Sequence, residues 1–407
     1  MDQIIYVCVV GTGTAGKHSN VMAGISFAIR RRMPDYCYLV PSSSEDSMTC
    51  ANLVAEEVGK ITKTEIMPVS NPDDINICRG EIKKIIIQAQ CAHPGAKVVL
   101  NPTSGTKQMT TAAVLAAVET GLQDIDYIGG ERDSGVVKTG SEKMLNISLR
   151  PVFAHRALES ALTLHKGMSD FEAVKLLTPY QDFYPKTIAL LRALAARDHF
   201  DYVNALNVAD ALPGGKSSAL ATATRELLNA KDVSLPRAAD ILCFVERCIE
   251  SGRPEEALAN LYRCVELFCK LKLQEYGVDE GATMETISGE FDVKGALRTK
   301  IMAELEGDDG FNPGMATAFK LLRVRHGLDF ELCRMVFDDK KTWHRLQFRQ
   351  QTRYGHGVKP ADQKTVEALA SVVKSAAVTD WPELAELITK HRFPKLEDIV
   401  KEEMDNA

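Results

Sequence analysis

The chain has 407 residues, and its 49 Lys and Arg residues against 55 Asp and Glu residues give a net charge of −6. With 45% apolar and 26% charged residues, the composition is that of a globular protein of two or three domains and excludes a disordered chain. The sequence contains no run of 18 apolar residues, which excludes a membrane-spanning helix.

The first 150 residues alternate short apolar runs with helical patterns. The predicted strands are, in chain order, residues 4–10, 36–40, 65–69, 97–100, 125–128 and 145–152. The first predicted helix ends near residue 32. The second covers residues 47–61, the third lies within residues 73–92, and the fourth covers residues 106–120. Apolar strands that alternate with crossover helices predict a parallel sheet covered on both faces. We interpret this region as a Rossmann-like α/β domain whose last strand could pair antiparallel at an edge.

The pattern changes at about residue 154, after which helical periodicity continues almost to the end of the chain. A break at residues 251–254 precedes Glu255 and Glu256, and acidic residues favour the N-terminal end of a helix. We therefore expect three domains. They are an α/β domain over residues 1–153, a helical linker over 154–250 and an α-helical domain over 251–407.

The cysteines and the start of the chain bear on the cellular compartment. The ten cysteines form no CxxC pair and no Cys/His cluster with zinc spacing, so we expect thiols in a reducing compartment and no metal site. The first residues lead directly into a strand, without the basic segment or cleavage site of a secretory signal. We therefore expect a cytoplasmic protein that makes no contact with a membrane.

The first predicted strand is followed by the glycine-rich turn GTGTAG, residues 11–16, and then by a helix. This is the context of the GxGxxG fingerprint of dinucleotide-binding proteins. The turn also nearly matches a P-loop, because Lys17 follows Gly16, but His18 stands where a Ser or Thr would bind magnesium. The second strand has no acid at its tip to hold a ribose. Nucleotide binding, an NAD enzyme and a purely structural turn all remain open at this point.

The fourth predicted strand leads into a second small polar turn, NPTSGTK at residues 101–107, which opens a helix. Backbone N–H groups at a helix start, hydroxyls and the lysine are groups that hold phosphate or ribose. Because the carboxyl ends of parallel strands share one edge of a sheet, we expect both turns there. Two such turns suit an extended anionic ligand, and a capped helix with a solvated lysine is the structural alternative.

Residues 320–360 carry ten Lys and Arg residues against four acids, a net charge of +6 that predicts an anionic partner. Lys341, Arg345, Arg349 and Arg353 recur every four residues, so we expect one basic stripe on a helix. We expect this helix to end near the glycines that flank His356, which would let the imidazole approach Arg349. Arginine grips phosphate and histidine transfers protons, so the pair could cleave RNA without metal. A solvated basic face is the alternative.

The sequence VGTG after the first strand and the pattern Asn-x-Thr-x-Gly-Thr-Lys after the fourth resemble the CRISPR-associated Rossmann fold, or CARF domain, over residues 1–150. The resemblance implies that a cyclic oligoadenylate, a tetra- or hexa-adenylate, binds both loops across a two-fold dimer interface, and that no other cofactor is required. The candidate ligand-binding residues are Gly11, Thr12, Gly13, Thr14, Gly16, Lys17, Ser42, Asn101, Thr103, Ser104, Gly105, Thr106 and Lys107.

The segment RQQTRYGHG, residues 349–357, is similar to the arginine–polar–histidine motif of HEPN ribonucleases, and residues 257–267 resemble an earlier helix of the same domain. The resemblance covers residues 251–407 and implies that Arg349 clamps phosphate while His356 transfers protons. It implies supporting roles for Gln350, which replaces a commoner asparagine, and for Arg353. Glu266 could pair with Arg349, position substrate or be an ordinary surface residue.

Together the two resemblances imply a homodimeric, cyclic-oligoadenylate-activated and metal-independent endoribonuclease that cleaves single-stranded RNA in type III CRISPR antiviral defence. Arg and His of both protomers would meet at a composite site. One alternative is a ring nuclease in which Lys17 and Lys107 act on the cyclic ligand. Another is a non-catalytic, ligand-responsive regulator whose basic stripe binds nucleic acid. Aromatic residues near the stripe, Trp343, Phe348 and Tyr354, could stack on bases or pack in the core.

Overall fold

The computed structural model describes residues 3–12, 18–133, 136–212, 218–306, 311–325 and 328–405. The chain divides into two compact units, Met1–His155 and Arg156–Ala407. Four predicted ligand-binding residues, Gly13, Thr14, Gly16 and Lys17, lie outside the described residues.

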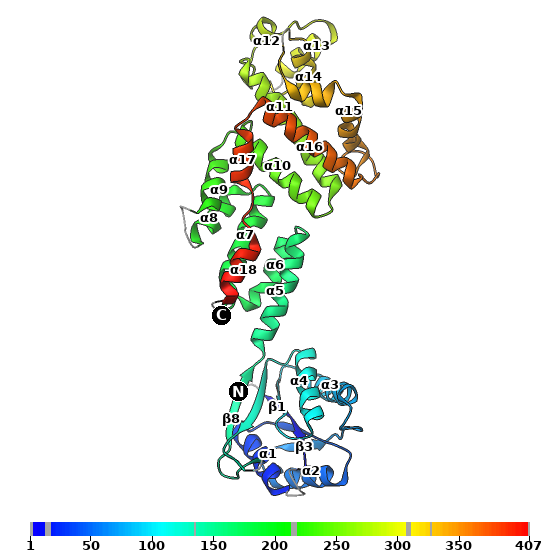
Figure 1. Ribbon diagram of the computed structural model, residues 1–407, viewed down its shortest axis with the longest axis vertical. Coiled ribbons are helices and arrows are strands. Elements are labelled where there is room, and N and C mark those ends of the chain that lie inside the picture. Colours follow the sequence, from blue (N-terminus) through cyan, green and yellow to red (C-terminus); the bar gives the residue numbers. More distant parts are fainter. Residues whose placement is uncertain are drawn as a thin grey trace. The chain divides into compact units, whose positions relative to one another are not determined.

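The first unit is built on a six-stranded sheet with the strand order β3-β2-β1-β4-β5-β8 (Figure 1). The strands are β1 (Ile4–Val10), β2 (Tyr36–Pro41), β3 (Lys63–Ile66), β4 (Lys97–Asn101), β5 (Asp124–Gly129) and β8 (Lys143–Ser148). The first five run parallel, and β8 pairs antiparallel with β5. A small hairpin, β6 (Arg132–Asp133) and β7 (Val136–Val137), separates β5 from β8 in the chain. The predicted Rossmann-like α/β fold is confirmed.

Both faces of this sheet are covered by helices. The four helices are α1 (His18–Arg32), α2 (Glu45–Val58), α3 (Ile75–Ala92) and α4 (Lys107–Glu119). Alternate residues of β1 point to opposite faces, as strand geometry requires. Ile5 and Val7 pack in the core beneath α3 and α4, whereas Tyr6 and Cys8 pack in the core beneath α1 and α2. A strand buried on both faces explains the continuous apolar run IIYVCVV.

The bounds of two strands in the structure differ from the predicted bounds. The strand predicted over residues 145–152 ends at Ser148, and α5 (Arg150–Lys166) begins two residues later. Pro151 falls in the first turn of α5, where a missing N–H costs no helical hydrogen bond. The strand predicted over residues 65–69 is instead Lys63–Ile66, and Val69 forms only an isolated bridge with Ser42.

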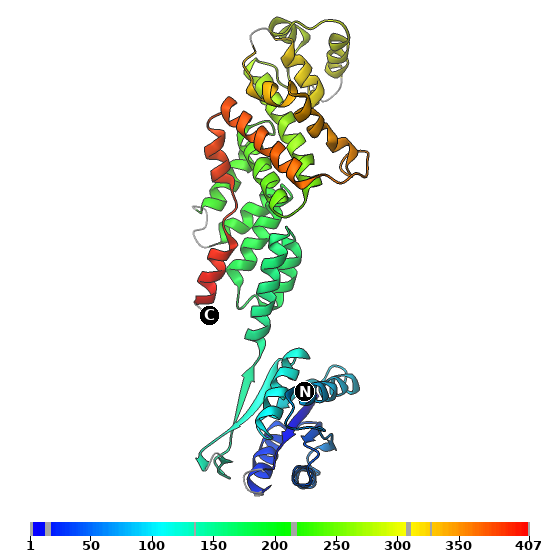
Figure 2. The same cartoon turned by 45° about the vertical axis from the view of Figure 1, so that its right-hand side comes forward.

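The second unit is helical, and no strand occurs among its described residues (Figure 2). After α5, which crosses the boundary between the units, the helices are α6 (Asp170–Leu177), α7 (Pro185–Asp198), α8 (Tyr202–Ala211), α9 (Ala219–Asn229), α10 (Leu235–Glu250), α11 (Pro254–Glu275), α12 (Met284–Glu290), α13 (Gly295–Leu305), α14 (Met315–Arg323), α15 (Lys340–Gln347), α16 (Gln363–Asp380), α17 (Leu384–His391) and α18 (Leu396–Asp405). The predicted all-α region is confirmed. None of the described helices combines the length and apolar character that a membrane crossing needs.

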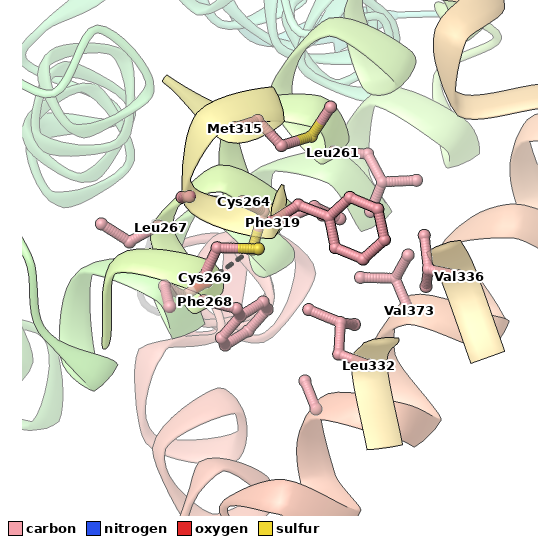
Figure 3. Close-up of a cluster of buried hydrophobic side chains, with 14 of the residues drawn as sticks. Leu261, Cys264, Leu267, Phe268, Cys269, Met315, Phe319, Leu332, Val336 and Val373 are labelled. Carbon is pink, nitrogen blue, oxygen red and sulfur yellow. Dashed lines mark hydrogen bonds between the residues drawn. The ribbon is translucent and has the colours of Figure 1, made fainter. Parts of the chain in front are cut away.

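Helix α11 runs through the core of the second unit. Its buried side chains Leu261 and Phe268 pack with Phe319 of α14 and Val373 of α16 (Figure 3). The helix begins at Pro254, with two acids in its first turn, as the sequence predicted. The ten cysteines are unpaired, and all except Cys91 are buried.

Candidate functional site

A pocket of about 650 Å³ opens at the carboxyl ends of β1 and β4. These strands are neighbours in the sheet at the point where the strand order reverses, which is where ligands bind in open α/β sheets. Seven of the predicted ligand-binding residues line it: Gly11, Thr12, Ser42, Thr103, Ser104, Gly105 and Thr106. The pocket therefore brings the two predicted turns together on one edge of the sheet.

The two turns are in direct contact. The backbone N–H of Gly11 donates a hydrogen bond to Oγ of Ser104, 3.0 Å away. A Cβ atom on Gly11 would lie 2.5 Å from the backbone nitrogen of Gly105, too close for any side chain. Gly105 itself has φ +110°, a conformation that L residues rarely adopt. Glycine is therefore required at both positions.

Asn101 shapes the second turn from beneath and does not line the pocket. Its buried amide donates to the Tyr6 hydroxyl at 3.2 Å and accepts from the Thr103 N–H at 3.0 Å. Thr106 caps α4 by accepting from the Met109 N–H at 3.1 Å. Lys107 is exposed at the start of α4 and is not among the described residues that line the pocket.

Serines that follow β2 form a third wall of the pocket, of which the sequence predicted Ser42 but not Ser44 or Ser47. Ser47 donates to the Val10 carbonyl at 3.0 Å and accepts from the Ser42 N–H at 3.0 Å, which ties β1 to the start of α2. The hydroxyls of Ser42 and Ser44 lie 2.9 Å apart. All three serines line the pocket, so its walls are rich in hydroxyl and backbone N–H groups, which suit ribose and phosphate oxygens.

In the helical unit, the prediction of one continuous helix carrying four basic residues is wrong. Helix α15 ends at Gln347, Arg349 lies in a 3₁₀ turn over Phe348–Gln351, and Arg353 lies in the following loop. The fully buried Thr352 explains the break, because its N–H and hydroxyl both donate to the Arg349 carbonyl, at 3.1 and 2.8 Å. A side chain that satisfies the backbone in this way competes with the helix.

The loop then folds back on the 3₁₀ turn. The His356 N–H donates to the Gln350 carbonyl at 2.9 Å, and the Gly357 N–H donates to the Thr352 carbonyl at 3.2 Å. A Cβ atom on Gly355 would lie 2.5 Å from Cα of Gln350. A Cβ atom on Gly357 would lie 2.1 Å from the Gln351 carbonyl oxygen. The two glycines therefore permit the fold-back that returns His356 to the turn carrying Arg349.

Arg349 rests on an aromatic ring from a distant part of the chain. Its Cζ atom lies 5.3 Å from the ring centroid of Tyr262 on α11, a cation–π contact. Its Nε is buried and has no hydrogen-bond partner among the described residues. Burial raises the pKa of Tyr262, so the neutral phenol supports the guanidinium. Sequence analysis missed the role of Tyr262, because no local pattern links it to a residue 87 positions away.

Other predicted residues lie near this loop. The ion pairs of Glu266 among the described residues join it to Arg263, at 2.5 Å, and to Lys270, at 3.0 Å, rather than to Arg349. The Arg353 guanidinium lies 5.1 Å from the ring centroid of Tyr354, whose side chain is exposed. Gln350 is exposed, and its contact with His356 runs through the backbone.

The remaining aromatic residues pack in the core, and no metal-ligand cluster accompanies them. Trp343 packs against Phe337, with ring centroids 5.1 Å apart, and Phe348 is partly buried against the core of the unit. Within the described part of the chain, no group of three or more His, Cys, Asp and Glu side chains is arranged to hold a metal ion.

Comparison with known proteins bears on both units. Residues 229–380 match a family model described as the Csm6 HEPN domain. A solved structure of Enterococcus italicus Csm6, bound to cyclic hexa-2′-fluoro-hexa-dAMP, aligns with a TM-score of 0.64 at 12% identity, over 96% of this chain and 98% of that chain. No curated protein matches the sequence. The resemblance to CARF–HEPN proteins is confirmed: the chain shares the fold of Csm6, and residues 229–380 of its helical unit match the HEPN model.

Proposed function

We propose that this protein is a cyclic-oligoadenylate-activated endoribonuclease that cleaves single-stranded RNA, without a metal ion, in type III CRISPR antiviral defence. The observation that carries the proposal is the loop that returns His356 to the Arg349 turn, within residues that match the Csm6 HEPN domain. An arginine and a histidine held on one short turn suit phosphodiester cleavage, because the first binds phosphate and the second moves protons.

The chemistry follows from the two side chains. The ribose 2′-oxygen attacks the adjacent phosphorus, the bond from phosphorus to the 5′-oxygen breaks, and a 2′,3′-cyclic phosphate and a 5′-hydroxyl are left. The His356 imidazole accepts the 2′-hydroxyl proton or donates a proton to the leaving oxygen. The Arg349 guanidinium stabilises the negative charge that develops on the phosphoryl oxygens. Gln350 and Arg353 act in support, through the backbone of the loop and through the positive field around it.

The first unit would bind the activator. Its pocket combines Gly11 and Gly105 in touching turns with a wall of serine hydroxyls, and the Csm6 structure with the same fold holds a cyclic hexanucleotide analogue. We propose that a cyclic tetra- or hexa-adenylate binds here across a homodimer. The ligand would favour the arrangement of the two chains in which both Arg349–His356 pairs form one composite site.

The test is cleavage of labelled single-stranded RNA in EDTA, with cyclic tri-, tetra- or hexa-adenylate. Wild type is expected to cut with one ring size, and His356→Ala is expected to lose at least 100-fold in rate, the lower range for a proton-transfer residue. RNA that stays intact with every ring would overturn the proposal. The fate of the rings in the same tubes would then distinguish a ring nuclease from a non-catalytic regulator.

A further inference from the structure

A second pocket of about 650 Å³ lies in the helical unit, beside the loop that carries Arg349 and His356. Residues of α11, α15 and α16 line it, together with residues at both ends of that loop. Phe348, which lines the pocket, immediately precedes Arg349. Pro360, also in the lining, follows Lys359, whose N–H donates to the Gln351 carbonyl at 2.8 Å. A molecule in this pocket would therefore lie next to the proposed catalytic loop.

The floor of the pocket is apolar. Leu258 of α11 and Val366 and Leu369 of α16 line it and are almost fully buried. The partly buried ring of Phe348 adds an aromatic surface. A floor of this kind suits the flat face of a nucleobase, because an aromatic side chain can stack on a base of any sequence.

The rim of the pocket is basic on the α15 side. Lys340, Lys341 and Arg345 contribute basic side chains to the lining, and His344 is exposed beside them. None of the three has an ion-pair partner among the described residues, although Lys341 lies within the electrostatic reach of Asp339. The one carboxylate of the lining, Asp362, is held by the Thr365 N–H, at 2.8 Å, as the cap of α16. The rim therefore presents more positive than negative charge to an anionic group.

An apolar, aromatic floor with a cationic rim matches the two halves of a nucleotide. We propose that this pocket is a subsite for one nucleotide of the single-stranded RNA substrate, one position beyond the two nucleotides that flank the scissile phosphate. The base would lie on Phe348 and the α16 floor, and its phosphate would face Lys341 and Arg345. The subsite rests on the proposed ribonuclease function and would add affinity for RNA longer than a dinucleotide.

The test compares two substrates for the full-length protein with its activating ring, a labelled dinucleotide and a labelled 12-nucleotide RNA. For the double variant Lys341→Ala/Arg345→Ala, KM for the 12-mer is expected to rise about tenfold, since two solvent-accessible charge contacts together are worth a factor of that order. Its kinetics on the dinucleotide, which does not reach the subsite, are expected to stay unchanged. The salt dependence of 12-mer binding should also become shallower. The matched control is Lys364→Ala, an exposed lysine on α16 outside the pocket.

Three other outcomes would overturn the proposal of a nucleotide subsite in this pocket. An unchanged KM for the 12-mer would show that the pocket does not hold RNA. An equal loss on both substrates would place Lys341 and Arg345 at the cleavage site itself. Dissociation of the homodimer by the double variant, seen in light scattering, would identify a second copy of the chain as the occupant. If wild type cuts neither RNA, the proposed function fails first, so the two failures are distinguishable.

Discussion

The backbone N–H of His356 donates a hydrogen bond to the carbonyl oxygen of Gln350, 2.9 Å away, across a loop that returns on itself. Six residues separate Arg349 from His356, a spacing that on a continuous helix would hold the two side chains about 10 Å apart along the axis. The fold-back instead brings the backbone of His356 into hydrogen-bond contact with the residue that follows Arg349. The candidate active site thus depends on where α15 ends as much as on the two side chains themselves.

The first prediction concerns Gly355. Because a Cβ atom there would lie 2.5 Å from Cα of Gln350, Gly355→Ala should displace the loop and reduce RNA cleavage at least tenfold. The matched control is Gly289→Ala, since a Cβ atom on Gly289 of α12 would meet nothing within 4 Å. Alanine at that helical position should leave cleavage unchanged. Equal activity of both variants in steady-state assays would show that the fold-back does not position the catalytic residues.

Tyr262 is predicted to support Arg349 through its ring. Tyr262→Phe keeps the aromatic face and should retain most of the activity, whereas Tyr262→Leu removes it. A partly exposed cation–π contact is worth about 1 kcal/mol, so the leucine variant should lose roughly fivefold in kcat/KM. Single-turnover cleavage with saturating activator measures this loss. A phenylalanine variant as inactive as the leucine variant would assign the role to the hydroxyl instead.

Ser104 is predicted to hold the two ligand loops together. Ser104→Ala removes the acceptor of the Gly11 N–H, and the loss of such a bond costs about 1 kcal/mol. The affinity for the activating ring, measured by calorimetry, should therefore fall about fivefold. Thr111→Ala is the control, because Thr111 is exposed on α4 and does not line the pocket. Unchanged affinity in the serine variant would mean that ring binding does not need this contact.

The pair of His165 and Asp170 predicts a pH dependence of stability. Burial opposes the positive charge of His165, but the hydrogen bond and charge of Asp170, 2.7 Å away, outweigh it and raise the pKa of the imidazole. A raised pKa in the folded state gives a stabilisation that is complete below the ordinary value of about 6.5 and is lost as pH rises through the folded pKa.

Asp170→Asn should therefore lower the free energy of unfolding by about 1–2 kcal/mol at pH 6 and by less at pH 9. Urea unfolding at several pH values measures the difference. A variant whose deficit is the same at both pH values would show that Asp170 stabilises the fold without the charge of His165.

A buried network behind the ligand pocket predicts a large effect on the first unit. Asp126 is fully buried and accepts hydrogen bonds from the Tyr6 hydroxyl, at 3.0 Å, and from Arg32, at 2.6 and 2.8 Å. Asp126→Ala leaves the buried Tyr6 hydroxyl without its acceptor and the half-buried Arg32 guanidinium without its partner, and should cost about 2–3 kcal/mol. Thermal unfolding would record the loss, and a change below 1 kcal/mol would contradict it.

The sequence predicts the central strands β1, β2 and β4 well because they are buried on both faces. The run IIYVCVV is apolar at every position, so strand β1 is unambiguous, and glycine at residues 11 and 105 marks turns that only glycine can make. The end of α15 was not predictable in this way. It is set by the buried hydroxyl of Thr352, whose hydrogen bond to the Arg349 carbonyl cannot be inferred from the residue type alone.

Contacts between residues far apart in the chain could not be predicted from the sequence either. The contact of Arg349 with Tyr262 joins residues on different helices, and no periodicity within either segment specifies it. Similarly, Ser47 lines the ligand pocket from α2 because β1 and β2 are neighbours in the sheet. The order of the strands in the sheet therefore determines which residues share the site. The sequences of the two turns do not reveal that order.

The most direct test of the account measures ring binding and RNA cleavage on the same two variants. His356→Ala should bind the activating ring with wild-type affinity and cut no RNA. Gly11→Val, which places a side chain against Gly105, should bind no ring and should likewise leave RNA intact, although its Arg349 and His356 are unchanged. Ring-dependent cleavage by Gly11→Val, or wild-type cleavage by His356→Ala, would contradict a ligand site in the first unit that controls catalysis in the second.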